Sequence, residues 1–405
     1  MNETVPILKN IRVLDFGRYV AGPYCATLLG YLGAEVIRIE RLEGGEDRYI
    51  APVTRHGEGG VFLQTACNKQ SLALDLTHPD AKPIIQQLVA TADVVVVNLP
   101  PKSCLAMGLD YATLSAINPR IILATQTAFG EHGPFANRGG FDGVGQAMSG
   151  AMVISGVPGA PAKAAAPYVD YSTAVLSAFG VLAALIERAT SGLGQQVGAA
   201  LQATALAVFG SHLIEQGVTA ANRIGTGNRV QTSAPSDVFA TCDGHILIHC
   251  VGNGLFKRWA KLMVDGDPAD LDRWVQDPMH ANDALRGENS TQILEQMRDW
   301  CAERSNAQAL RELEAAGIPA GPVYTPQQAL DDPQARAMHW FKEIADYPGL
   351  PRPAPVPDLP LRFSRSAAGI AQRPPTLGEH TDQILESLGF DAQLRQDLRE
   401  RGVIR

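Results

Sequence analysis

Residues 14–41 read LDFGRYVAGPYCATLLGYLGAEVIRIER, and this stretch decides the fold class. A short β-prone run at residues 11–16 leads into a loop marked by glycine and proline. Pro23 suits the first turn of a helix, where its missing N–H costs nothing, and Gly33 is a natural helix stop. The following run, residues 35–39, is again β-prone. The order strand, loop, helix, strand predicts a parallel βαβ unit.

The same alternation continues along the next part of the chain. Strand-like runs at residues 72–76, 94–97 and 121–126 are separated by helix-like segments. Parallel strands joined by right-handed helical crossovers form an open sheet that helices cover. We therefore predict an α/β fold.

A second, smaller α/β domain is predicted for residues 225–325. The pair Asp243–Gly244 lies between two apolar runs, which is a hairpin signal. Helix-like segments follow at residues 256–263, 291–301 and 307–316. The proline-rich residues 348–360 predict an extended connector. Two short helices are expected at residues 381–388 and 391–401.

The composition excludes several classes of protein. Of the 405 residues, 45% are hydrophobic and 19% are charged, as in ordinary globular proteins. The net charge is −8 and no basic run is present, which argues against a dedicated nucleic-acid binder. The six cysteines form no C-x-x-C pair and fit a reducing compartment.

The sequence predicts no membrane anchor and no secretion signal. The N-terminus lacks a basic segment followed by an apolar core. The longest apolar stretch, residues 174–186, is shorter than the about 20 residues that span a bilayer, and it predicts a buried helix. We expect a soluble, cytoplasmic protein.

Neither a dinucleotide site nor a metal site is predicted. The loop after the first strand reads G-R-Y-V-A-G-P and lacks the G-x-G-x-x-G spacing. The glycine runs at Gly192 and Gly225 match that pattern only in part and lack a βαβ setting. The nine histidines are scattered along the chain. We therefore expect neither NAD nor a bound metal.

Asp170 is the acidic residue with the most unusual surroundings. It lies in AAAPYVDYSTAVLSAFG, among small and apolar residues, just before the predicted buried helix. A carboxylate there is either the N-cap of that helix or a reactive group in a cleft. The local sequence alone favours the cap.

Several motifs together resemble one known family. They are residues 14–41, NKQSLALDL at Asn68, ADVVVVNLPP at Ala92, NPRIILATQTAFGEHGP at Asn118, GGFDGVGQAMSG at Gly139, GIPAGPVYTPQQALDDPQ at Gly317 and GEHTDQILESLG at Gly378. In this order they resemble the class III CoA-transferases, the family that includes formyl-CoA:oxalate CoA-transferase and α-methylacyl-CoA racemase. The resemblance extends from residue 8 to the C-terminus.

The resemblance implies an architecture. The family has a Rossmann-like large domain built from both chain ends, here residues 1–224 and 326–405, and a small domain inserted between them, here residues 225–325. Two subunits thread through one another, so an interlocked homodimer is expected. Coenzyme A takes the place of a dinucleotide and is a substrate, so no cofactor is expected. The expected partners are an acyl-CoA and a carboxylic acid.

The resemblance also implies site residues. Asp170 aligns with the catalytic aspartate of the transferases, and Asp142 with an acidic residue near it. The expected contacts of coenzyme A are Val20, Ala21, Arg41 (at the nucleotide phosphate), Leu74, Asp75, Asn98, Leu99 and Pro100. Ala106 stands where the family usually has an arginine, and Lys102 or Arg138 is a candidate replacement.

The implied reaction is CoA transfer to a short or dicarboxylic acid through an aspartyl-CoA thioester. The run Gly252–Asn253–Gly254 is a candidate cover for the oxyanions, and its other interpretation is a simple strand-to-helix turn. An α-methylacyl-CoA racemase-like enzyme and a catalytically silent CoA-ester-binding homologue are the alternatives. The racemase branch has a catalytic histidine in a G-H-D pattern, and this chain has Phe141 there, which disfavours the racemase.

Overall fold

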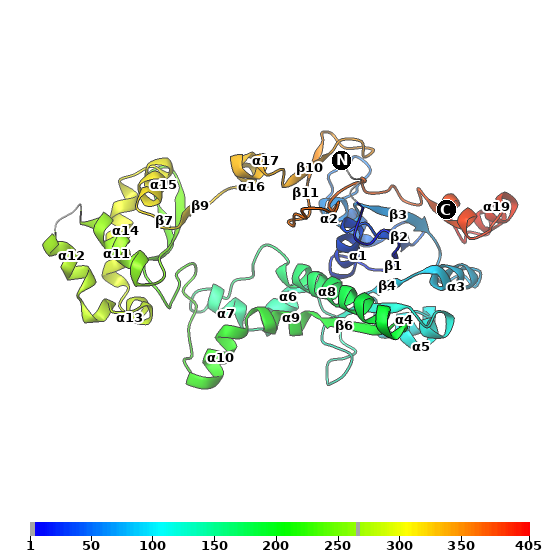
Figure 1. Ribbon diagram of the computed structural model, residues 1–405, viewed down its shortest axis with the longest axis horizontal. Coiled ribbons are helices and arrows are strands. Elements are labelled where there is room, and N and C mark those ends of the chain that lie inside the picture. Colours follow the sequence, from blue (N-terminus) through cyan, green and yellow to red (C-terminus); the bar gives the residue numbers. More distant parts are fainter. Residues whose placement is uncertain (1–4, 265–267) are drawn as a thin grey trace. The chain divides into compact units, whose positions relative to one another are not determined.

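The computed structural model of the chain describes residues 5–264 and 268–405 (Figure 1). Contacts between residues divide the chain into two compact units. The first consists of Met1–Gly150, Ala164–Thr219 and Pro333–Arg405, and the second of Ala151–Lys163 and Ala220–Asp332. The first unit is therefore built from both ends of the chain.

The first unit contains a parallel sheet of six strands in the order β3-β2-β1-β4-β5-β6. The strands are β1 (Arg12–Asp15), β2 (Glu35–Glu40), β3 (Lys69–Ala73), β4 (Val94–Val97), β5 (Ile122–Thr127) and β6 (Gln196–Ala200). The predicted α/β class with a parallel sheet is confirmed. The strand order is that of Rossmann folds, and it reverses between β1 and β4.

The helices of the first unit lie between its strands in the sequence or after the last of them. They are α1 (Ala21–Tyr31), η1 (Glu46–Tyr49), α2 (Gly60–Thr65), α3 (Ala81–Thr91), α4 (Pro101–Met107), α5 (Tyr111–Ile117), α6 (Asp142–Met148), α8 (Tyr168–Ser191), α9 (Leu201–Val208), α10 (Gly210–Thr219), α17 (Pro333–Ala337), α18 (Thr381–Ser387) and α19 (Ala392–Glu400). Helices α18 and α19 confirm the two short helices predicted near the C-terminus.

The central strand β4 explains why the sheet is covered on both faces. Its four valines are all buried. Side chains alternate between the faces of a strand, so Val95 and Val97 join a core with α3, α5 and α18. Val94 and Val96 join another core with α1 and α8. A continuous apolar strand of this kind is typical of a parallel sheet buried on both sides.

Helix α8 is buried on one side only, which corrects the prediction of a buried helix. Ala174, Ala178 and Val181 pack in the core, whereas Phe179 and Ile186 are 68% and 75% exposed. By length and composition alone α8 could cross a membrane, a test that core helices also pass.

Part of the proline-rich segment, predicted as a connector, is a strand. Strands β10 (Phe341–Ile344) and β11 (Ala354–Pro357) form an antiparallel pair. Proline is tolerated in such a pair because each strand has a free edge. Val356 is buried against the neighbouring α2 region.

The second unit contains a three-stranded antiparallel sheet in the order β7-β8-β9. Its strands are β7 (Ser236–Ala240), β8 (His245–His249) and β9 (Ala320–Pro322). The predicted hairpin at Asp243–Gly244 is confirmed, because it joins β7 and β8. The helices are α7 (Ala151–Ser155), α11 (Asn253–Met263), α12 (Pro268–Val275), η2 (Pro278–His280), α13 (Asp283–Glu288), α14 (Thr291–Ala302), α15 (Asn306–Ala315) and α16 (Pro326–Asp331).

Candidate active site

A cavity of about 520 Å³ lies in the first unit, where the chain leaves the carboxyl ends of β1, β4 and β5. Residues 18–21, 98–101 and 126–128 line it, together with residues 136–141, Val144, Asp170 and Leu201. Open α/β sheets bind ligands outside the carboxyl ends of their strands, where the strand order reverses. The cavity occupies that position, between the loops that follow β1 and β4.

A second cavity of about 420 Å³ lies between the α2 region and residues 350–357. Its lining is mostly apolar and proline-rich, and Arg352 is the one ionisable side chain in it. This cavity therefore offers no nucleophile or general base.

Asp170 lines the larger cavity from the first turn of α8. It is the third residue of the helix, and Pro167 holds the N-cap position. The N-cap interpretation of Asp170 is therefore wrong. The carboxylate is half-buried and belongs to the cavity.

Asp142 performs the capping of α8 from another helix. Its Oδ1 atom accepts hydrogen bonds from the amides of Val169, at 2.8 Å, and of Asp170, at 3.2 Å. Its Oδ2 atom accepts one from Nε2 of Gln146 at 2.6 Å. These amides have no partner inside the helix, and Asp142 satisfies them. Asp142 is buried and does not line the cavity.

The electrostatic surroundings favour the neutral form of Asp170. Burial, and to a smaller extent the nearby negative charge of Asp142, raise the pKa of Asp170 to about 7. A carboxyl group that titrates near neutral pH inside a cavity is typical of a functional site.

The loop between β1 and α1 is held by Asn98, which follows β4. The Asn98 side chain accepts from the amide of Arg18 at 2.7 Å and donates to the Arg18 carbonyl at 2.8 Å. The next residue, Tyr19, has φ 61°, a left-handed conformation that is uncommon outside glycine. Its ring meets that of Phe141 edge-on at 5.2 Å. Strained backbone held by its surroundings is concentrated at functional sites.

The structure brings together six of the residues singled out by sequence. Those that line the cavity are Asp170, Val20, Ala21, Asn98, Leu99 and Pro100. Val20 and Ala21 form the start of α1, and the free amides of a helix start favour bound anions.

Three other residues lie at the ends of β2 and β3 but do not line the cavity. Arg41 is paired through its guanidinium with Glu46 at 2.7 Å and Glu43 at 3.3 Å. Leu74 is fully buried, and the Asp75 carboxylate accepts from the amide and hydroxyl of Thr77.

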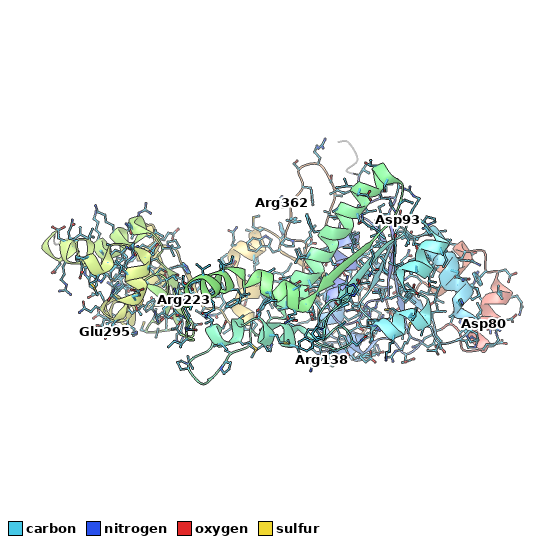
Figure 2. All side chains as sticks on the ribbon, turned by 90° about the horizontal axis from the view of Figure 1, so that it is seen from below. Asp80, Asp93, Arg138, Arg223, Glu295 and Arg362 are labelled. Atoms are coloured by element: carbon cyan, nitrogen blue, oxygen red, sulfur yellow. The ribbon has the colours of Figure 1, made fainter. Side chains whose placement is uncertain are left out.

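The cavity also contains two arginines. Arg138, a candidate replacement at Ala106, is exposed (Figure 2). Its guanidinium lies 4.7 Å from the ring centre of Phe135. Arg18 was missed by the sequence analysis, although it lies inside the G-R-Y-V-A-G-P loop. Lys102 is exposed on α4 and does not line the cavity.

Gly252 lies in the second unit, at the N-cap of α11 and shortly after β8. Its amide donates to both carboxylate oxygens of Asp283, at 2.8 and 3.0 Å. Its φ of +88° favours glycine. These features are those of a strand-to-helix turn.

Within residues 5–264 and 268–405, no group of three or more His, Cys, Asp and Glu side chains is arranged to hold a metal ion. The features of the site are therefore the carboxylate of Asp170, the start of α1 and the two arginines.

A profile of CoA-transferase family III matches residues 8–381. The chain therefore belongs to this family, which confirms the resemblance seen in the motifs. It is an enzyme, a CoA-transferase.

Relatives match over nearly the whole chain. Succinate–glutarate CoA-transferase of Agrobacterium fabrum is 31% identical, over 96% of this chain and 97% of its own. The beta subunit of succinyl-CoA–L-malate CoA-transferase of Chloroflexus aurantiacus is 31% identical, over 99% and 98%. Human succinyl-CoA:glutarate CoA-transferase is 30% identical, over 100% and 91%.

Solved structures show the same fold. A CaiB/BaiF family protein from Brucella suis has a TM-score of 0.81 and 30% identity, over 95% of this chain and 100% of that one. Rv3272 from Mycobacterium tuberculosis has a TM-score of 0.81 and 28% identity, over 94% and 100%.

Proposed function

We propose that this enzyme transfers coenzyme A between dicarboxylic acids, with Asp170 as the covalent nucleophile. The observation that carries the proposal is the half-buried Asp170 carboxylate in a cavity at the reversal point of the sheet. The relatives named above support the substrate class, since their names specify succinate, glutarate and malate.

The first half of the reaction moves CoA onto the enzyme. The Asp170 carboxylate attacks the thioester carbonyl of the donor and expels the CoA thiolate, which leaves a mixed anhydride. The thiolate then attacks the Asp170 carbonyl. The donor leaves as a carboxylate, and an aspartyl-CoA thioester remains.

The second half moves CoA to the acceptor. The acceptor carboxylate attacks the aspartyl thioester, expels the thiolate and forms a second mixed anhydride. The thiolate attacks the acyl carbonyl of the acceptor, which yields the new acyl-CoA and frees the Asp170 carboxylate. No water is consumed, so the energy of the thioester is conserved.

The pKa of Asp170 suits this role. A carboxylate raised to a pKa of about 7 is a stronger nucleophile than an ordinary one and is still substantially ionised at neutral pH. Its own amide already donates to Asp142 and therefore does not disperse the charge of Asp170.

Coenzyme A is proposed to lie along the carboxyl edge of the sheet. Val20, Ala21 and residues 98–100 would contact it within the cavity, near Asp170. Arg41, Leu74 and Asp75 lie at the neighbouring strand ends and would contact its adenosine end.

The assembly proposed is an interlocked homodimer with residues 225–325 as an inserted small domain. The composition of the first unit from both chain ends supports the domain organisation. The exposed apolar side chains of α8 and α10 support a partner surface, and they include Val175, Leu176, Phe179, Ile186, Ile214 and Val218. Apolar surfaces of this kind mark interfaces between proteins.

Mass spectrometry of the covalent intermediate tests the proposed function. Wild-type enzyme incubated with succinyl-CoA and no acceptor should gain a CoA adduct on the peptide that contains Asp170. Addition of glutarate or malate should remove the adduct and yield the matching acyl-CoA. An adduct on another residue, or exchange of the α-proton without CoA transfer, would contradict the proposal.

A further inference from the structure

Arg18 is a cavity residue that forms no direct ion pair with a described carboxylate. Its half-buried side chain lines the cavity, and its Nη1 atom donates to the Gly17 carbonyl at 3.1 Å. Among the residues that the structure describes, no carboxylate oxygen lies within 4.0 Å of its guanidinium. Arg18 differs in this respect from Arg41, whose guanidinium pairs with two glutamates.

The charges beneath Arg18 are already balanced. Three buried ion pairs connect β1, β2, β3 and η1: Lys69 with Asp15 at 2.7 Å, Arg38 with Asp47 at 2.6 Å, and Arg48 with Glu40 at 2.5 Å. All six side chains are at most 1% exposed. Three cations and three carboxylates sum to zero, and Asp47, Glu40 and Asp15 act on Arg18 only from beyond ion-pairing distance.

The Arg18 side chain is directed toward the loop that follows β2. A Cβ atom placed on Gly45 would lie 3.5 Å from Cδ of Arg18. Asp170 lies on the first turn of α8, where the ring of the next residue, Tyr171, meets that of Tyr24 on α1 at 4.8 Å.

The acyl-CoA of a dicarboxylic acid carries two kinds of anion. The distal carboxylate of a four- or five-carbon acyl group lies only a few bonds from the thioester carbon that Asp170 attacks. The phosphates lie at the far end of the pantetheine arm. The loop that follows β2 begins with Arg41, proposed above to contact the adenosine end of coenzyme A, so an arginine directed toward this loop is placed for phosphate.

We propose that Arg18 binds a phosphate group of coenzyme A. The guanidinium fork matches two phosphate oxygens at once, and charge-assisted bonds of this kind are strong. The two hydrogen bonds between Asn98 and the Arg18 backbone, together with the fixed backbone of Tyr19, hold the Arg18 backbone before ligand arrives. The proposal rests on the proposed function in taking an acyl-CoA as the ligand of this cavity.

Calorimetric titration of the full-length Arg18→Gln and Arg18→Lys variants tests the proposal. The ligands are CoA, dephospho-CoA and pantetheine, which differ in their phosphates. The Gln variant should bind CoA at least about tenfold more weakly than wild type. Pantetheine affinity should be unchanged, and Lys should restore part of the CoA affinity. A loss for CoA alone assigns the 3′-phosphate, and an equal loss for dephospho-CoA assigns the diphosphate.

The matched control is Arg12→Gln, since Arg12 forms an exposed pair with Glu35 at the opposite end of β1. Its CoA affinity should equal that of wild type. An unchanged Kd for CoA in Arg18→Gln would overturn the inference, as would a higher KM for the acceptor acid with the CoA Kd unchanged. Failure of the wild-type enzyme to bind CoA would instead contradict the proposed function itself.

Discussion

The Oδ1 atom of Asp142 lies 3.2 Å from the amide nitrogen of Asp170 and accepts its hydrogen bond. One carboxylate therefore holds the turn of helix that presents the other. The same contact brings a negative charge close to Asp170 and contributes to its raised pKa. The position of the proposed nucleophile, and part of the rise in its pKa, thus depend on one buried side chain.

Replacement of Asp170 by Asn should abolish CoA transfer and leave CoA affinity nearly unchanged. The amide keeps the shape of the side chain but cannot attack a thioester. Steady-state assays and calorimetric titration measure the two quantities. Asp170 does not cap α8, so the variant should also fold normally. Appreciable turnover by the Asn variant would exclude Asp170 as the nucleophile.

The kcat/KM of wild-type enzyme should fall about tenfold per pH unit below pH 7, since only the ionised Asp170 attacks. Asp142→Asn removes a negative charge and should move this acid limb to lower pH. Gln146→Met is the control, because it breaks the bond to Oδ2 of Asp142 and keeps the charge. An acid limb that shifts equally in both variants would refute the electrostatic explanation.

Asp170→Asn should be more stable than wild type above pH 7. The pKa of Asp170 is about 7 in the folded protein, against an ordinary value of 3.8. Between these values the folded state binds more protons than the unfolded state, so the stability of wild type falls as the pH rises. Urea unfolding at pH 8 should show a gain of roughly 2–4 kcal/mol, which shrinks toward pH 4. A gain independent of pH would contradict this account.

Lys69→Met should destabilise the protein by about 3–5 kcal/mol, because it leaves the Asp15 carboxylate buried without its partner. The Nζ atom also donates to the Pro23 carbonyl at 2.6 Å, which ties β3 to the first turn of α1. Arg12→Met removes an exposed pair and should cost at most about 1 kcal/mol. Equal losses of unfolding free energy in the two variants would show that burial of the Lys69 pair is unimportant.

Light scattering should give a mass of about twice 43.2 kDa. Phe179→Glu places a charge on the exposed apolar face of α8 and should weaken the dimer. Glu295→Lys, a charge change at an exposed position of the second unit, is the control. A stable wild-type monomer at micromolar concentration would contradict the proposed assembly.

The sequence predicts the first βαβ unit and β4 well, because their residues are apolar or punctuated by glycine and proline. It misplaces β3, predicted at residues 72–76 and found at Lys69–Ala73. The strand begins with Lys69, whose charge disguises a buried position. Strand β6 was missed, because Gln196–Ala200 contains only one β-branched residue and follows β5 by about 70 positions.

Individual residues of the site can be predicted from the sequence, but the contacts between them cannot. Asp170 was recognised from its apolar surroundings and its motif. The capping of α8 by Asp142 was not predicted, because Asp142 and Asp170 are separated by 28 positions and lie on different helices. Arg18 was overlooked because an arginine in a loop is usually a solvated charge, and only the folded structure shows that it lines the cavity without an ion pair to a described carboxylate.

The outer strand β3 is completed by the last residues of the chain. Leu74, directly after it, bridges to Ile404, and the amide of Asp75 donates to the Val403 carbonyl at 2.9 Å. During synthesis on the ribosome, more than 300 residues must emerge between these partners. Until residues 403 and 404 emerge, the nascent chain therefore carries an uncovered sheet margin, a state in which unpaired strands invite aggregation. Closure of this margin waits for a segment made about 330 residues after the strand.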